Sequence, residues 1–136
     1  ALAAAMETSG ILQSTAAYFS GQAATPFLLT VLLISAASAF LSELMSNTAL
    51  ATIMIPLAGS IATGLNLHPL ELAAPVTIAA SAAFMLPMGT PPNAIVFSSG
   101  HISIARMVKA GFFLNLLGIL LTTLFARLVM PYCFDY

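Results

Sequence analysis

Two short polar segments interrupt this otherwise apolar chain, and they carry most of the residues whose types could do chemistry. The first is Ser46-Asn47-Thr48 and the second is Gly89-Thr90-Pro91-Pro92-Asn93. The asparagine and threonine side chains of each segment offer amide and hydroxyl groups that suit the recognition of a carboxylate. No Lys or Arg lies near either segment. A carboxylate bound between them would therefore need another source of positive charge.

The second segment also predicts a pair of helix ends. Each proline removes a backbone donor and disfavours helical geometry in the residue before it, so no single helix passes through. Thr90 can cap a half-helix that begins at Pro91 or Pro92, and the positive end of that helix dipole then faces the gap. The half-helix before the gap, ending near Met88, exposes carbonyls, which bind cations.

The first segment has the same two properties. Ser46 or Asn47 caps the helical arm that begins at Ala49, and the last carbonyls of the arm ending at Met45 are unpaired. Broken helices that present donors to an anion and carbonyls to sodium are the recurring device of secondary transporters. Each segment has a structural alternative, a surface loop for the first and a helix kink for the second. Their joint occurrence in one small apolar chain favours the functional interpretation.

Composition indicates that these segments lie in a membrane. Of 136 residues, 60% are hydrophobic and 5% are charged, with three Lys or Arg against four Asp or Glu. Soluble domains carry roughly 25% charged residues. Nucleic-acid binding is excluded because no basic patch is present to meet phosphates. A charge at the bilayer centre costs at least about 2.5 to 3.5 kcal/mol, so a dianion brought there needs compensation from bound cations.

Hydrophobic patterning predicts an all-α membrane protein. Five segments are expected: the end of a transmembrane helix at 1–9, an interfacial arm helix at 10–24, a pair of apolar helices at 26–64, a discontinuous transmembrane helix at 70–99 and a final transmembrane helix at 102–131. The discontinuous helix is expected to be helical over roughly 70–86 and 92–99. Because residue 1 lies in an apolar helical stretch, we expect the C-terminal part of a longer membrane protein.

One acidic residue, Glu43, falls inside the apolar region, just before the first polar segment. Intramembrane ionisable residues are functional candidates by default. Glu43 either tunes coupling to sodium or protons or plays a buried, hydrogen-bonded structural role. An enzyme is not indicated, since the chain shows no paired intramembrane carboxylates, zinc motif or activated nucleophile.

The two segments together are specific enough to indicate a family. The Ser46-Asn47-Thr48 turn, followed by Gly89-Thr90-Pro91-Pro92-Asn93-Ala94 and then Ser99-Gly100-His101, closely resembles the divalent anion/sodium symporters, the sodium-coupled dicarboxylate transporters. The similarity covers nearly the whole chain and is greatest to bacterial members. It implies one inverted repeat, the C-terminal one, of an elevator-type transporter. Residues 26–64 would then be a re-entrant hairpin with the first polar segment at its tip.

The resemblance also implies the site residues. Asn47 and Thr48 would contact a substrate carboxylate, with Ser46, Thr90 and Pro91 lining the same site. A sodium (Na+) site would be formed by Ser42, the Met45 carbonyl, Asn47 and Gly89, of which Ser42 and Met45 lie outside the strict motif.

The function implied by the resemblance is sodium-coupled symport of a dicarboxylate such as succinate, malate or fumarate. The implied partners are the N-terminal half of the same transporter with a matching motif, a second copy in a homodimer, and the lipid bilayer of the cell inner membrane. Three alternatives stay open: a sodium-independent exchanger of the same family, a non-transporting membrane subunit, and sulfate or citrate as the substrate.

Overall fold

The computed structural model describes residues 5, 8–20 and 26–133, and within them the chain is helical with no β-strand. The helices, in chain order, are α2 (Ile11–Ser20), α3 (Phe27–Leu41), α4 (Asn47–Gly64), α5 (Pro69–Ala80), α6 (Pro91–Ser98) and α7 (Ile104–Cys133). The prediction of an all-α chain is confirmed for this part. The transmembrane helix end expected at 1–9 falls largely outside the described residues, as does the end of the arm at 21–24.

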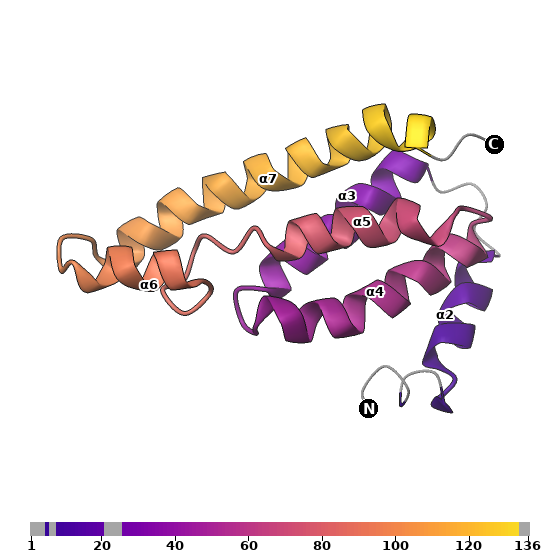
Figure 1. Ribbon diagram of the computed structural model, residues 1–136, viewed down its shortest axis with the longest axis horizontal. Helices are drawn as coiled ribbons and strands as arrows, with labels where there is room; N and C mark the ends of the chain where they lie inside the picture. Colours follow the sequence, from indigo (N-terminus) through magenta and orange to yellow (C-terminus); the bar gives the residue numbers. More distant parts are fainter. Residues whose placement is uncertain (1–4, 6–7, 21–25, 134–136) are drawn as a thin grey trace.

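Four helices pack into the body of the molecule, with α5 at its centre. Helix α5 contacts α3, α4 and α7, and α3 also packs against α7. The short helix α2 crosses one end of this body against α4, whereas α6 lies at the opposite end beside the first half of α7 (Figure 1). The core is apolar, and its fully buried members include Val31, Leu50, Leu72 and Val76. The body therefore holds α3, α4 and α5 in fixed relation to each other.

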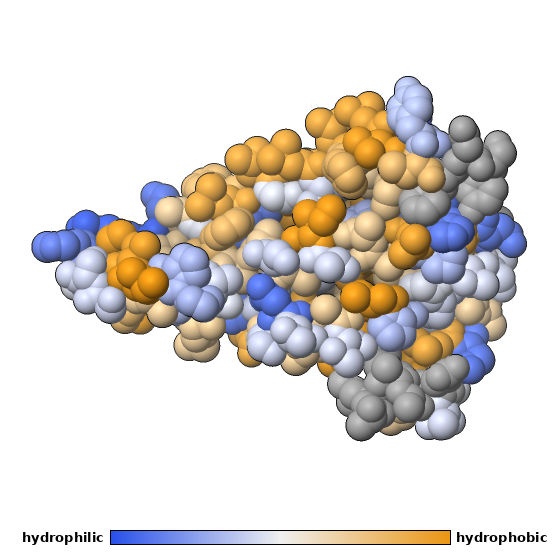
Figure 2. All heavy atoms as spheres, in the orientation of Figure 1, coloured by the Kyte–Doolittle hydropathy of each residue, from blue (hydrophilic) through white to orange (hydrophobic). Residues whose placement is uncertain are grey.

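Length and hydropathy together separate α7 from the other helices. At about 1.5 Å per residue, the 15 residues of α3 and the 12 residues of α5 extend about 22 and 18 Å, short of a bilayer core of about 30 Å. Among the described residues, the 30-residue α7 is the one helix long and apolar enough to cross a membrane. Its outer face is a row of exposed Leu and Phe side chains, seen along the upper edge of Figure 2.

The non-helical segment before α6 is longer than expected. Helix α5 ends at Ala80, so the helix predicted to continue to about residue 86 stops six residues earlier, and residues 81–90 form the break. The physical reason is that the amides of Phe84, Met85 and Leu86 donate to side chains from other elements. In a continuous helix these amides would donate to backbone carbonyls four residues earlier, and here the side chains accept the hydrogen bonds instead.

Candidate functional site

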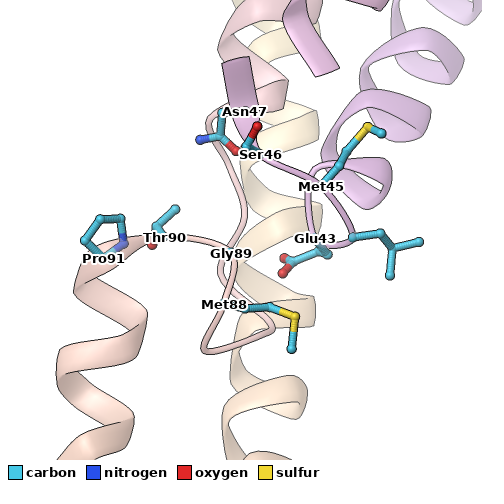
Figure 3. Close-up of a pocket in the computed structure, with 9 residues that line it drawn as sticks. Glu43, Met45, Ser46, Asn47, Met88, Gly89, Thr90 and Pro91 are labelled. Carbon is cyan, nitrogen blue, oxygen red and sulfur yellow. The ribbon is translucent and has the colours of Figure 1, made fainter. Parts of the chain in front are cut away.

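The two polar segments meet at one cavity of about 410 Å³. In Figure 3 the turn between α3 and α4 faces the segment that leads into α6. The residues that line the cavity come from these two turns alone: Glu43, Leu44, Met45, Ser46, Asn47, Met88, Gly89, Thr90 and Pro91. Residues far apart in the sequence are thus brought to a single site.

Ser46 defines the start of α4. It is the N-cap, in extended geometry, and its Oγ accepts a hydrogen bond from the Ala49 N–H at 3.2 Å. Of the two candidate caps, the structure selects Ser46 over Asn47. Because both residues line the cavity, the positive end of the α4 dipole lies at the cavity wall.

The start of α6 is built differently. Thr90 has extended N-cap geometry, but its side chain makes no capping hydrogen bond, contrary to expectation. Pro91 and Pro92 follow, and neither has an N–H to be capped. The Ala94 N–H is satisfied by the Thr90 carbonyl at 3.2 Å. The Thr90 hydroxyl is therefore not needed for capping and remains at the cavity.

Several oxygens of the residues that line the cavity lack hydrogen-bond donors among the described residues. Asn47 Oδ1 is buried and has no partner. The backbone carbonyls of Met45 and Gly89 receive no hydrogen bond from any described residue. For the buried Asn47 Oδ1, the lack of a partner is costly unless something else satisfies it. Neutral amide and carbonyl oxygens of this kind suit a sodium ion.

Two of the residues expected at the site do not line the cavity. Ser42 is fully buried at the end of α3, and its Oγ donates to the Ala39 carbonyl at 2.7 Å. Thr48 is exposed on the first turn of α4, where its carbonyl accepts from Thr52 Oγ1 at 2.8 Å. The other expected residues, Met45, Ser46, Asn47, Gly89, Thr90 and Pro91, are brought together.

Asn93 differs from the expectation that its amide recognises a carboxylate. Its Nδ2 donates to the Ala83 carbonyl at 2.8 Å and to the Leu86 carbonyl at 3.0 Å. Since the group has two donor hydrogens, both are occupied. The expectation is wrong for this side chain, which instead ties the first turn of α6 to the break.

Glu43 is buried, with 4% of its surface exposed, and three donors surround its carboxylate. Oε1 accepts from the Met85 N–H and from Asn115 Nδ2, both at 2.8 Å, and Oε2 accepts from the Leu86 N–H at 3.0 Å. Because all three partners are donors, they match the ionised carboxylate, which only accepts. The geometry agrees with the structural alternative for Glu43, and the residue also lines the cavity (Figure 3).

Asn115 was overlooked at the sequence level. It is fully buried in α7, and its Oδ1 accepts from the Phe84 N–H at 3.2 Å. On the same face of α7, a Cβ at Gly111 would overlap the Phe84 backbone, so the break approaches α7 closely there. The signal was available, because a polar residue within an apolar span marks an internal contact and Gly111 and Gly118 flank it at helical spacing.

The chain matches the family model described as citrate transporter over residues 1–136. The chain therefore belongs to the citrate transporter family.

Individual relatives carry more specific names. A sodium-dependent dicarboxylate transporter of Staphylococcus saprophyticus is 46% identical over 104 residues, which cover 76% of this chain and 20% of that protein. Na(+)/dicarboxylate cotransporter 3 of Rattus norvegicus is 48% identical over 99 residues, which cover 73% of this chain and 16% of that protein. Solute carrier family 13 member 2 of Mus musculus is 50% identical over 95 residues, which cover 70% of this chain and 16% of that protein. The expected similarity to sodium-coupled dicarboxylate transporters is confirmed, and the chain spans about a fifth or less of these relatives' length.

Proposed function

We propose that this chain forms part of a sodium-coupled secondary transporter, a symporter of dicarboxylates such as succinate, malate or fumarate. The observation that carries the proposal is the meeting of two helix breaks at one cavity whose wall holds unpaired neutral oxygens. The names of the relatives support sodium as the coupled ion and a dicarboxylate as the substrate.

The charges at the cavity support coupling to a cation. Its lining includes one carboxylate, Glu43, and no Lys or Arg. A dianion that enters such a cavity meets a negative charge in a medium of low dielectric constant, where repulsion is strong. Helix dipoles offset only part of this, since each terminus is equivalent to about half a charge. Bound sodium ions supply the remaining positive charge.

Asn47 has a double role in this proposal. Its buried Oδ1 binds sodium together with the carbonyls of Met45 and Gly89, and Ser42, which is buried outside the cavity lining, contributes its hydroxyl oxygen. Its Nδ2 donates to the substrate carboxylate, which Ser46, Thr90 and Pro91 of the lining and Thr48, the next residue of α4, also contact. One side chain then binds both ligands, so each stabilises the binding of the other.

The helix lengths support the arrangement in the membrane. Because α3 and α5 are each too short to cross, we propose that residues 26–64 are a re-entrant hairpin and that residues 70–99 are a discontinuous helix, with residues 102–131 as the final span. Residues 10–24 act as an interfacial arm. The chain works with the N-terminal half of the transporter, in a homodimer in the cell inner membrane, and carries substrate by an elevator movement.

The test is uptake of labelled succinate by the complete transporter in liposomes, with and without an inward sodium gradient. Sodium-dependent uptake is expected for the unchanged protein, and a loss of at least about tenfold for Asn47→Ala and Thr48→Ala, the size expected for one lost hydrogen bond to a charged group. Thr63→Ala is the matched control, because this exposed threonine lies at the far end of α4 and bonds only within its own helix.

Three outcomes would contradict the proposal. Uptake that ignores sodium and requires substrate inside the liposome would indicate an exchanger. Uptake unaffected by Asn47→Ala would refute the assignment of the site. An equal loss in Thr63→Ala would mean that damage to α4 explains the effect.

A further inference from the structure

A set of buried hydrogen bonds connects the break between α5 and α6 to the two elements on either side of it. Glu43, which follows α3, accepts hydrogen bonds from the backbone amides of Met85 and Leu86. Asn115 of α7 accepts one from the amide of Phe84. Asn115 also donates to Glu43 at 2.8 Å. Two side chains thus hold three consecutive backbone amides of the break.

The orientation of the Asn115 amide is determined by these partners. Its Oδ1 faces a backbone N–H, so its Nδ2 must face Glu43. Glu43 is in turn fixed at both oxygens. Non-helical backbone at membrane depth is tolerated only where its polar groups are satisfied by protein or by a water-filled cavity. The two side chains accept hydrogen bonds from the backbone amides in the part of the break next to the cavity.

Gly89, whose carbonyl is a proposed sodium ligand, lies directly against these hydrogen-bonded groups. A Cβ built on Gly89 would lie 3.3 Å from Glu43 Oε2 and 3.3 Å from the Leu86 carbonyl oxygen. The Gly89 N–H also bonds the Leu86 carbonyl at 3.1 Å. The position of the Gly89 carbonyl therefore depends on where Glu43 holds Leu86.

We propose that Asn115 and Glu43 form a positioning pair that sets the affinity for sodium. Asn115 orients Glu43, Glu43 fixes the backbone of residues 84–86, and this backbone places the Gly89 carbonyl at the cavity. The proposal rests on the proposed sodium-coupled function. It adds that a residue of α7, outside the cavity, controls cation binding.

The first experiment measures succinate uptake by the full-length transporter over a range of sodium concentrations. Asn115→Leu removes both bonds and keeps the branching of the side chain, and Glu43→Gln replaces one acceptor oxygen by a donor. Both are expected to raise the sodium concentration of half-saturation at least about tenfold, which corresponds to about 1.4 kcal/mol. The maximal rate at saturating sodium is expected to stay within about twofold, since the substrate-contacting residues are retained.

The matched control is Ser38→Ala. Ser38 is another fully buried polar residue of α3, and its Oγ donates to the Val76 carbonyl of α5 at 3.0 Å, but it does not line the cavity. Its loss removes a buried bond of the same body without touching the break. The half-saturation concentration is therefore expected to stay unchanged.

A double variant tests whether the two residues act as a unit. In Glu43→Gln with Asn115→Asp, the new amide can donate to the new carboxylate, with donor and acceptor exchanged, although the Met85 N–H then loses the oxygen that accepts it. Its sodium half-saturation is expected to lie below the value that independent, additive effects of the two substitutions would give. Independent, additive effects of the two substitutions would overturn the pairing.

A second measurement does not depend on transport. Hydrogen–deuterium exchange of the segment 84–89 in the purified full-length protein is expected to be slow, and to rise at least about tenfold in Asn115→Leu, while the segment 69–80 is unaffected. Unchanged exchange would overturn the proposal. So would unchanged sodium half-saturation in a protein that transports. Loss of sodium dependence in the unchanged protein would instead refute the proposed function, and exchange would still decide whether the pair holds the break.

Discussion

Ser46 combines a structural role with a proposed ligand-binding role in one small side chain. Its Oγ caps α4, and the residue lines the cavity. An aspartate at this position would keep the capping oxygen but add a negative charge beside Glu43. The two roles can therefore be separated by choosing the substitution.

We expect Ser46→Ala to lower the stability of the protein and Ser46→Asp to lower its affinity for the substrate. Ser46→Ala loses the cap and is expected to be destabilised by about 1 kcal/mol, whereas Ser46→Asp retains stability because aspartate is an equally good N-cap. Ser46→Asp is expected to lower the affinity for dicarboxylate at least about tenfold through repulsion. Thermal unfolding of the purified protein and substrate titration measure the two effects.

The control for this pair is Ser60→Ala on the same helix. The Ser60 Oγ bonds only the Leu57 carbonyl, one turn back, and Ser60 does not line the cavity. It is expected to change neither quantity appreciably. A stability loss in Ser46→Asp equal to that in Ser46→Ala would contradict the capping role.

Local chemistry explains which residue-level predictions succeeded. The cap at Ser46 and the helix start at Pro91 depend on neighbours within four residues, so the sequence around them is sufficient. Asn93 and Asn115 depend on backbone groups that a regular helix would have occupied. Their roles could be assigned only after the position of the break in space was known.

At the scale of elements, the close approach of the break to α7 requires a glycine. A Cβ at Gly111 would overlap the Phe84 carbonyl group and lie 2.6 Å from the Met85 Cα, and these backbone atoms cannot rotate away. Gly59 of α4 offers the contrast, since a Cβ there would meet only the Pro69 Cβ at 3.8 Å, an ordinary contact.

We therefore expect opposite signs for two chemically identical substitutions. Gly111→Ala is expected to destabilise by about 1 to 3 kcal/mol or more, as overpacking does. Gly59→Ala is expected to be neutral or stabilising by up to about 1 kcal/mol, because alanine has the higher helix propensity. Thermal unfolding of the two purified variants decides the matter, and a loss of similar size in both would refute the close approach.

The length of the break shows where prediction by element fails. The apolar composition of residues 81–86 favours helix, and the expected helix continued to about residue 86 for that reason. The helix does not continue to residue 86 because the amides of residues 84–86 donate to the Glu43 carboxylate and the Asn115 amide oxygen instead. Hydrogen bonds to a charged group contribute roughly 1.5 to 3 kcal/mol, enough to outweigh helix propensity differences below about 1 kcal/mol.

At the scale of the whole molecule, a coupled ion must stabilise the folded protein. A ligand that binds only the folded state at 100 times its dissociation constant contributes about 2.7 kcal/mol. The proposed sodium site therefore predicts a higher unfolding temperature in sodium chloride than in potassium chloride at equal ionic strength. Thermal unfolding of the purified transporter in the two salts measures the difference.

Asn47→Ala provides the control for this prediction. Removal of the unpaired Oδ1 is expected to reduce the difference between the two salts, because one proposed ligand of the ion is gone. Equal unfolding temperatures in sodium and potassium for the unchanged protein would contradict a specific sodium site.

The hydrogen bonds of Glu43 also have a consequence for biosynthesis. Its partners lie 42, 43 and 72 residues further along the chain, so none exists when Glu43 leaves the ribosome. An unpaired carboxylate in apolar surroundings costs several kcal/mol, and this cost persists until both the break and α7 have been inserted. In a newly made chain, the surroundings of Glu43 are therefore completed only once α7 is in place.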